Sequence, residues 1–295
     1  MATKNRQPKL TRRACGAMAA HMALLERYPG FRTRQQRLEG ENARRRALGI
    51  LPAELKLAKI KVVVHVVYKD TSQNVSDAQI NSQIKVLNLD FRAKNSDKKK
   101  TPAVWSGLVA DSQVEFTLYK VTRTQTTRSS FGTDDGVKRA SSGGVPPLNA
   151  SRYLNMWVCP LGGGLLGYAQ FPGGPKSTDG VVINYLAFGT MGTAQAPFNK
   201  GRTATHEIGH YLNLRHIWGD TEDCTGSDLV ADTPNSAGPN FEKPTFPKVS
   251  CNNGPNGDMF MNYMDYVDDP AMFMFTPQQV ARIRTTLDGP RGGLW

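Results

Sequence analysis

Runs of apolar residues alternate with amphipathic segments along most of this chain of 295 residues. The most apolar run, Lys59–Tyr68, is rich in valine and predicts a buried β-strand. A helix is predicted to begin after Ser76, where Gln79 is placed to complete a capping box. Its apolar residues recur at helical spacing and predict one buried stripe: Ile80, Ile84, Leu87 and Phe91.

Further apolar runs before residue 186 predict four more strands, at Val114–Lys120, Tyr153–Cys159, Leu166–Phe171 and Val181–Tyr185. A strand, a long helix and then several strands are typical of an α+β domain with a mixed twisted sheet. Residues 219–275 are mostly loop. Thr276-Pro277 predicts the start of a closing helix that runs through Leu287, with Gly289 as its stop.

The N-terminal part differs from the rest in composition. Residues 11–48 are arginine-rich and helix-prone, and the break near Tyr28-Pro29-Gly30 predicts two short helices. The composition changes after Leu51-Pro52. Of the net charge of +12, residues 1–59 carry +10 (14 basic against 4 acidic) and residues 60–295 carry +2 (23 against 21). The basic character therefore belongs to the N-terminal segment.

A basic chain invites a nucleic-acid interpretation, but the nearly neutral body lacks basic aromatic strands and a helix-turn-helix pattern. A protein that binds DNA or a membrane surface is a weaker alternative, and its affinity would reside in residues 1–59. No run of 18 apolar residues predicts a membrane span. The N-terminus lacks the apolar stretch of a secretory signal. Four cysteines favour one disulfide, two unpaired thiols and an oxidising compartment.

Three of the five histidines lie within residues 206–216. His206 and His210 are four residues apart, so on a helix both imidazoles face one side and suit Zn²⁺. Glu207 lies beside the first histidine as the candidate general base. His216 lies too far round to bind from the same straight helix, so the chain must turn near Asn213. The extended motif has Gly there, and Asn also tolerates the left-handed conformation.

A second motif, Asn262–Tyr266, precedes the closing helix. Met264 is predicted to lie in a tight turn beneath the metal, where its thioether gives the histidines an apolar floor. Tyr266 follows two residues later, and its hydroxyl is a candidate donor to a developing oxyanion.

Together these motifs resemble the pappalysin family of metzincin metallopeptidases. The resemblance rests on Arg13–Gly16, Val62–Tyr68, Leu165–Phe171, Met259–Tyr266 and the histidine motif with its Ile217-Trp218-Gly219 extension. It implies a metzincin fold with an active-site helix and a Met-turn. It also implies zinc on His206, His210 and His216, Glu207 as the base, and Tyr266 assisting near the metal.

The resemblance further implies a small helical prodomain, residues 1–58, ahead of a catalytic domain at 59–295. The upper part of that domain would span about 59–213 and the lower part about 214–295. Cys15 matches a cysteine that binds zinc in the latent form and blocks it. Arg44-Arg45-Arg46 is a candidate activation site, and relatives favour Arg or Lys after the scissile bond.

Two structural features of the lower part are also implied. Cys224 and Cys251 match a family disulfide, while Lys243 and Ala271 stand where relatives have a second bridge. Asp228, Asp232 and Thr233 lie in the loop that matches a calcium site, although Asp-rich loops are often only solvated turns. Cys159, on a predicted strand, is interpreted as a buried free thiol.

The sequence therefore predicts a secreted, monomeric zinc endopeptidase that cleaves proteins or peptides and is made as a zymogen inhibited by its own prosegment. The apolar strand Leu166–Phe171 would form the edge that pairs with an extended substrate. The alternative from another class is a zinc-binding interaction module or pseudoenzyme. The undamaged motif argues against that alternative, and no nucleic-acid partner is expected.

Overall fold

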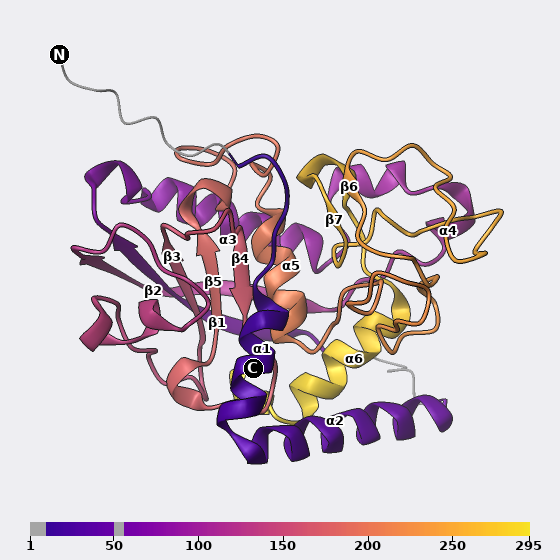
Figure 1. Cartoon of the computed structure of the whole chain (residues 1–295), viewed down its shortest axis with the longest axis horizontal. Helices are drawn as coiled ribbons and strands as arrows, with labels where there is room; N and C mark the ends of the chain where they lie inside the picture. Colours follow the sequence, from indigo (N-terminus) through magenta and orange to yellow (C-terminus); the bar gives the residue numbers. More distant parts are fainter. Residues whose placement is uncertain (1–9, 50–55) are drawn as a thin grey trace.

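The computed structural model describes residues 10–49 and 56–295. Figure 1 shows the large sheet on one side, the long loops on the other, and helix α5 between them. The helices are α1 (Ala17–Arg27), α2 (Pro29–Ala47), α3 (Asp77–Asp90), α4 (Ala103–Ser106), α5 (Arg202–Tyr211) and α6 (Pro277–Asp288). The strands are β1 (Ala58–Tyr68), β2 (Val114–Gln125), β3 (Leu154–Cys159), β4 (Gly167–Ala169), β5 (Val181–Asn184), β6 (Phe241–Glu242) and β7 (Tyr266–Val267).

Five strands form one sheet in the order β2-β1-β3-β5-β4. Neighbouring strands are parallel except at β4, which pairs antiparallel with β5 and forms one edge of the sheet. This confirms the predicted α+β class with a mixed sheet. Strands β6 and β7 form a separate parallel pair within the loop region.

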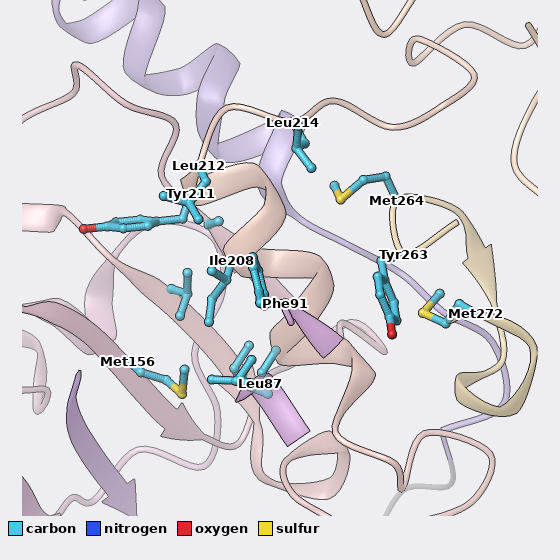
Figure 2. Packing of buried hydrophobic residues seen from close by; sticks show 14 of the residues in the cluster. Leu87, Phe91, Met156, Ile208, Tyr211, Leu212, Leu214, Tyr263, Met264 and Met272 are labelled. Carbon is cyan, nitrogen blue, oxygen red and sulfur yellow. The ribbon is translucent and has the colours of Figure 1, made fainter. Parts of the chain in front are cut away.

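Each face of the large sheet is covered. Even-numbered residues of β1, such as Val62 and Val64, belong to the main core with α3 and α5. Residues on the opposite face, including Val67 and Trp157, pack against Phe131 in a second cluster. Because both faces are buried, β1 reads as a continuous apolar run instead of an alternating one. Figure 2 shows part of the main core around α5, with Leu87 of α3 and Met156 of β3 on the same side.

The elements follow the predicted pattern with three differences. Strand β2 continues to Gln125 because β1 pairs with it along its whole length through a bulge at Val62/Val63. Strand β4 is shorter than Leu166–Phe171, since the Leu166 amide bonds outside the sheet, to the carbonyl of Ala14. Ser76 does cap α3. The predicted capping box is wrong, because the Gln79 side chain instead donates to the Phe188 carbonyl and the Thr193 hydroxyl.

The N-terminal segment forms the two predicted helices, with α2 beginning at Pro29. Helix α1 packs on β4, and α2 lies along α6 below it (Figure 1). The composition change at Leu51-Pro52 lies outside the described residues. Within the described residues, no helix is both long and apolar enough to cross a bilayer.

The loop region is fixed at several points. The disulfide Cys224–Cys251 closes a stretch 27 residues apart in sequence, which confirms one bridge and leaves Cys15 and the buried Cys159 as free thiols. Thr276 caps α6 in a complete capping box with Gln279. The predicted closing helix is therefore confirmed, and it runs one residue further, to Asp288.

A buried ion pair joins the end of the chain to the loop that precedes β5. Arg291 donates to both carboxylate oxygens of Asp179, at 2.7 and 2.9 Å. The same guanidinium donates to the carbonyl of Tyr211 and lies over that ring, 3.2 Å from its centroid. Tyr211 ends α5, so this cluster fixes the end of the central helix.

We expect Asp179→Asn to lower the free energy of unfolding by about 3–5 kcal/mol, because it leaves the Arg291 charge buried without its partner. Asp77→Asn is the matched control, since its pair with Arg123 lies at the surface, with Asp77 76% exposed, and such pairs contribute less than about 1 kcal/mol. Urea unfolding of the full chain measures both. Equal losses in the two variants would contradict this account.

Candidate metal centre

Helix α5 carries two of the histidines on one face. His206 and His210 are both fully buried, one turn apart. Gly209 lies between them and faces Met264, whose sulfur would collide with any Cβ at that position. The helix and the Met264 turn therefore approach more closely than a larger residue would allow. In Figure 2, Met264 and Tyr263 lie across α5 from Leu87 and Met156.

The chain turns sharply after α5 and brings back the third histidine. Asn213 adopts the left-handed conformation with φ of 73°. Its amide and that of Leu214 donate to the carbonyls of His210 and Gly209, which closes the helix end. His216, 1% exposed, then lies beside the two helix histidines.

The three imidazoles turn the same nitrogen toward one point. Nε2 of His210 lies 3.2 Å from Nε2 of His206 and 3.0 Å from Nε2 of His216. Each Nδ1 faces an acceptor outside the cluster, which fixes the tautomer with a lone pair on Nε2. These acceptors are the carbonyl of Tyr263 for His206, the carbonyl of Leu214 for His210 and the carboxylate of Asp220 for His216.

The electrostatics agree with a metal site. Burial and the neighbouring imidazoles hold the pKa of His206 well below its usual value, and burial lowers the pKa of His210 to about 3. Both rings are therefore neutral, as metal ligands must be. Cys15 Sγ joins them, and the four candidate ligand atoms all lie within 4.8 Å of one another. Imidazole and thiolate are the donors that Zn²⁺ prefers, so the residues fit that ion.

Glu207 lies beside this cluster. Its carboxylate accepts from the Cys15 thiol at 3.4 Å, and burial raises its pKa to about 8. Gly167 on β4 leaves room for it, since a Cβ there would lie 2.8 Å from Glu207 Cγ. The carboxylate therefore borders the place that the thiol occupies.

Two aromatic residues complete the surroundings of His216. Trp218 stacks on its ring with centroids 4.3 Å apart, and Tyr266 meets it edge-on at 4.8 Å. The Tyr266 hydroxyl donates to the Cys15 carbonyl at 3.4 Å. Burial raises the pKa of Tyr266, so its hydroxyl stays protonated and remains a donor.

Residues 14–16, just before α1, lie along the edge of β4. The Leu166 amide donates to the Ala14 carbonyl and the Gly16 amide to the Gly167 carbonyl, each at 2.9 Å. These bonds place Cys15 opposite Gly167 and aim its side chain at the histidines. Burial first, and then Glu207, raise the pKa of the Cys15 thiol.

The side chain of Arg13 binds the buried carboxylate of Asp269, next to the metal centre. Its guanidinium forms an ion pair with Asp269 at 2.6 Å and donates to the carbonyl of Val267 and the hydroxyl of Thr203. Both charged side chains are at most 1% exposed. Asp269 is fixed in turn by the backbone amides of residues 200 and 202.

A second contact joins the N-terminal helices to the histidine motif. Glu39 of α2 binds Arg282 of α6 through two hydrogen bonds of 2.8 Å. The same carboxylate accepts from the Asn213 side chain at 3.0 Å. Asn213 is the residue that stands where the extended motif has Gly, so its side chain gains a partner that glycine could not offer.

The three candidate calcium ligands all have hydrogen-bond partners within the chain. Thr233 donates to Asp228 at 2.7 Å, and burial raises the pKa of Asp228 to about 7. Asp232 instead faces the start of α6, where its two oxygens accept from the Thr276 hydroxyl and the Gln278 amide. Thr233 is thus bonded to Asp228, and both oxygens of Asp232 accept hydrogen bonds from the start of α6.

Sequence reasoning missed four residues that shape this site: Arg13, Glu39, Asp220 and Asp269. Asp220 carries a local signal, because it follows His216 by four residues. Arg13 is within the motif Arg13–Gly16, but nothing in the sequence places Asp269 opposite it. Glu39 is one of only four acidic residues in a basic segment, which is a usable hint of a specific partner.

Comparisons with known proteins agree with this geometry. Residues 147–288 match the peptidase family described as pregnancy-associated plasma protein-A. Extracellular metalloproteases of Arthroderma otae and Pyricularia oryzae are each 33% identical to the chain; they cover 79% and 84% of it, and it covers 79% and 81% of them.

Solved structures extend the likeness to the N-terminal segment. A promirolysin mutant of Tannerella forsythia is 43% identical with a TM-score of 0.86, and the match covers 96% of this chain and 97% of that one. Mature mirolysin in complex with a cleaved peptide is 48% identical with a TM-score of 0.80, covering 82% and 96%. The chain therefore belongs to the pappalysin family and is a zinc metalloendopeptidase, a hydrolase of peptide bonds.

Proposed function

We propose that this chain is the latent form of an extracellular zinc endopeptidase, with residues 1–58 as its prosegment. One observation carries the proposal: Cys15 Sγ completes a four-ligand cluster with His206, His210 and His216. Three protein ligands with an open position make a catalytic zinc site, and a fourth closes it. The relatives named extracellular metalloproteases and the disulfide support a secreted protein.

The proposed roles follow from what each side chain borders. When bound, zinc polarises the scissile carbonyl and lowers the pKa of a water. Glu207 lies 3.4 Å from the place that Cys15 Sγ holds, so departure of the thiol leaves this carboxylate beside the open position. There it accepts a proton from the attacking water and passes it to the leaving amine. Tyr266, released from the Cys15 carbonyl, donates to the oxyanion.

Substrate binding uses the edge of β4. That edge already holds an extended chain, through the bonds of Ala14 and Gly16 to Leu166 and Gly167. An extended substrate forms the same kind of backbone hydrogen bonds once the prosegment has left. The prosegment and the substrate therefore compete for one edge.

A preference for Arg or Lys after the scissile bond is supported by Arg13. Its guanidinium shows that the place beside the metal centre accepts a long cation and pairs it with Asp269 at 2.6 Å. An unpaired buried carboxylate is costly, so a substrate without a cation there leaves Asp269 uncompensated. Asp269 is thus the proposed specificity residue.

Latency is supported by the contacts that hold the prosegment in place. Cys15 meets the metal ligands, Arg13 meets Asp269, and Glu39 meets Arg282 and Asn213. Arg44-Arg45-Arg46, at the end of α2, is the proposed activation site. Calcium at Asp228, Asp232 and Thr233 and a monomeric state remain predictions; the buried carboxylate of Asp228 is the feature that a cation would stabilise.

Removal of the proposed base tests the mechanism. Glu207→Ala is expected to lower kcat of the activated, zinc-loaded chain by at least roughly a hundredfold, because proton transfer is lost. Zinc content, measured by atomic absorption, should stay at the wild-type level. A chelator should abolish wild-type cleavage of an unfolded protein. Equal cleavage in all three samples would overturn the mechanism, whereas zinc binding without any cleavage would favour an interaction module.

Weakening the prosegment tests latency. Glu39→Gln is expected to speed activation roughly tenfold, because two charge-assisted hydrogen bonds to Arg282 are weakened. Cys15→Ala should shorten the lag before activity still further. Glu26→Gln is the control in the N-terminal helices, because Glu26 is exposed on α1 and lies away from the proposed activation site. An unchanged lag in both Glu39→Gln and Cys15→Ala would count against a zymogen.

Substitution of Asp269 tests the proposed preference for Arg or Lys after the scissile bond. Asp269→Asn is expected to lower kcat/KM at least roughly tenfold for peptides with Arg after the scissile bond, since the buried charge pair is lost. Peptides with norleucine there should change little. Asp77→Asn is the control and should keep the preference, because Asp77 is a surface carboxylate that pairs with Arg123. If Asp269→Asn leaves the Arg-to-norleucine ratio intact, the assignment of Asp269 is wrong.

A further inference from the structure

Phe241 lies on the small β6-β7 sheet beside the metal centre. In that parallel pair it is opposite Tyr266, and the two ring centroids are 5.9 Å apart. Its half-buried ring holds the guanidinium of Arg12, whose central carbon lies 3.4 Å from the ring centroid. Arg12 itself is exposed. The ring thus offers its face to a cation at the border of the site.

We propose that Phe241 forms a second specificity subsite, which binds a cationic side chain at the second residue after the scissile bond. The inference rests on the proposed preference for Arg or Lys at the first residue, bound by Asp269. It assigns to the enzyme a preference for two consecutive basic residues on the leaving-group side of the cut.

The position of the subsite follows from two consecutive residues of the prosegment. Arg13 fills the place at Asp269, and Arg12, its neighbour, reaches Phe241. Because Arg12 and Arg13 are consecutive, adjacent residues of one chain reach the two places. Arg12 also lies one residue further than Arg13 from Cys15 and the metal ligands. For a substrate whose first residue after the cut binds Asp269, we therefore assign the second residue to Phe241.

The chemistry of the place favours a cation over an apolar side chain. An aromatic face attracts a guanidinium through its quadrupole, most strongly when the cation lies within about 6 Å of the centroid. The surroundings add negative charge: Glu242 follows Phe241, and its carbonyl accepts from the amide of Asp268, itself next to Asp269. Lys243 lies in the same region and offsets part of this charge.

Peptide selectivity tests the subsite. Fluorogenic peptides with Arg as the first residue after the bond, and Arg, Lys, Leu, Gln or Glu as the second, are cleaved by the full chain after zinc loading and activation. We expect Arg to exceed Gln in kcat/KM by roughly two- to fivefold, and to exceed Leu as well. F241L should bring the Arg-to-Gln ratio to about one, and F241W should restore it. F246L is the control, because Phe246 is exposed in the same loop region and contacts Trp105.

The outcomes distinguish a failure of the Phe241 subsite from a failure of the proposed function. If Leu equals Arg, or if the ratio survives in F241L, the cationic subsite is wrong. A second peptide series keeps Gln at the second residue and compares Arg with norleucine at the first. If the wild type shows no preference for Arg at the first residue, the proposed preference at Asp269 and this inference are both wrong. Its persistence, with no effect of F241L on the second residue, would overturn this inference alone.

A measurement without catalysis tests the same contact in the latent chain. In the Glu207→Ala background, hydrogen exchange of residues 10–16 should be roughly two- to fivefold faster with F241L, because the Arg12 contact is lost. F246L should leave that exchange unchanged. Equal exchange in both variants would show that Phe241 does not bind Arg12, and the subsite would lose its structural basis.

Discussion

The outward hydrogen bonds of the three imidazoles are the constraint on which the rest of the site depends. His206, His210 and His216 present Nε2 to one another only because each Nδ1 already has a fixed acceptor. Those acceptors come from the Met264 turn, the chain after α5, and the loop that begins at Asp220. A defect in any of these segments would rotate a ring away from the common point, so the chain after α5 is organised around imidazole orientation.

The N-terminal segment contacts this site at three points. Its part before α1 meets the metal ligands through Cys15 and the Asp269 carboxylate through Arg13, and its helix α2 reaches the turn at Asn213 through Glu39. These contacts differ in chemistry, since one is a thiol, one a buried ion pair and one a charged hydrogen-bond pair. The segment therefore contacts the metal ligands, the buried carboxylate of Asp269 and the turn at Asn213 at once.

The sequence predicted those features whose signal is local. The spacing of His206 and His210, the break at Pro29 and the cap at Thr276 each depend on a few neighbouring residues, and the structure has helices at all three. The contacts of Arg13 with Asp269 and of Glu39 with Arg282 join residues 256 and 243 positions apart, and no pattern along one chain encodes such pairs. Gln79 shows that a local pattern can also mislead, because its side chain bonds to the distant carbonyl of Phe188 instead of forming the predicted capping box.

The strand formed by Ala14 to Gly16 along β4 has a kinetic consequence, because it belongs to the same chain as the edge it covers. A tethered ligand faces its site at an effective concentration on the order of millimolar, whatever the concentration of the protein. Cutting the tether changes no contact at the site. Rebinding then depends on the concentration of the cleaved segment in solution, which falls on dilution. Under the proposed latency, release of the active enzyme would be governed by chain connectivity and volume as much as by the strength of any single bond.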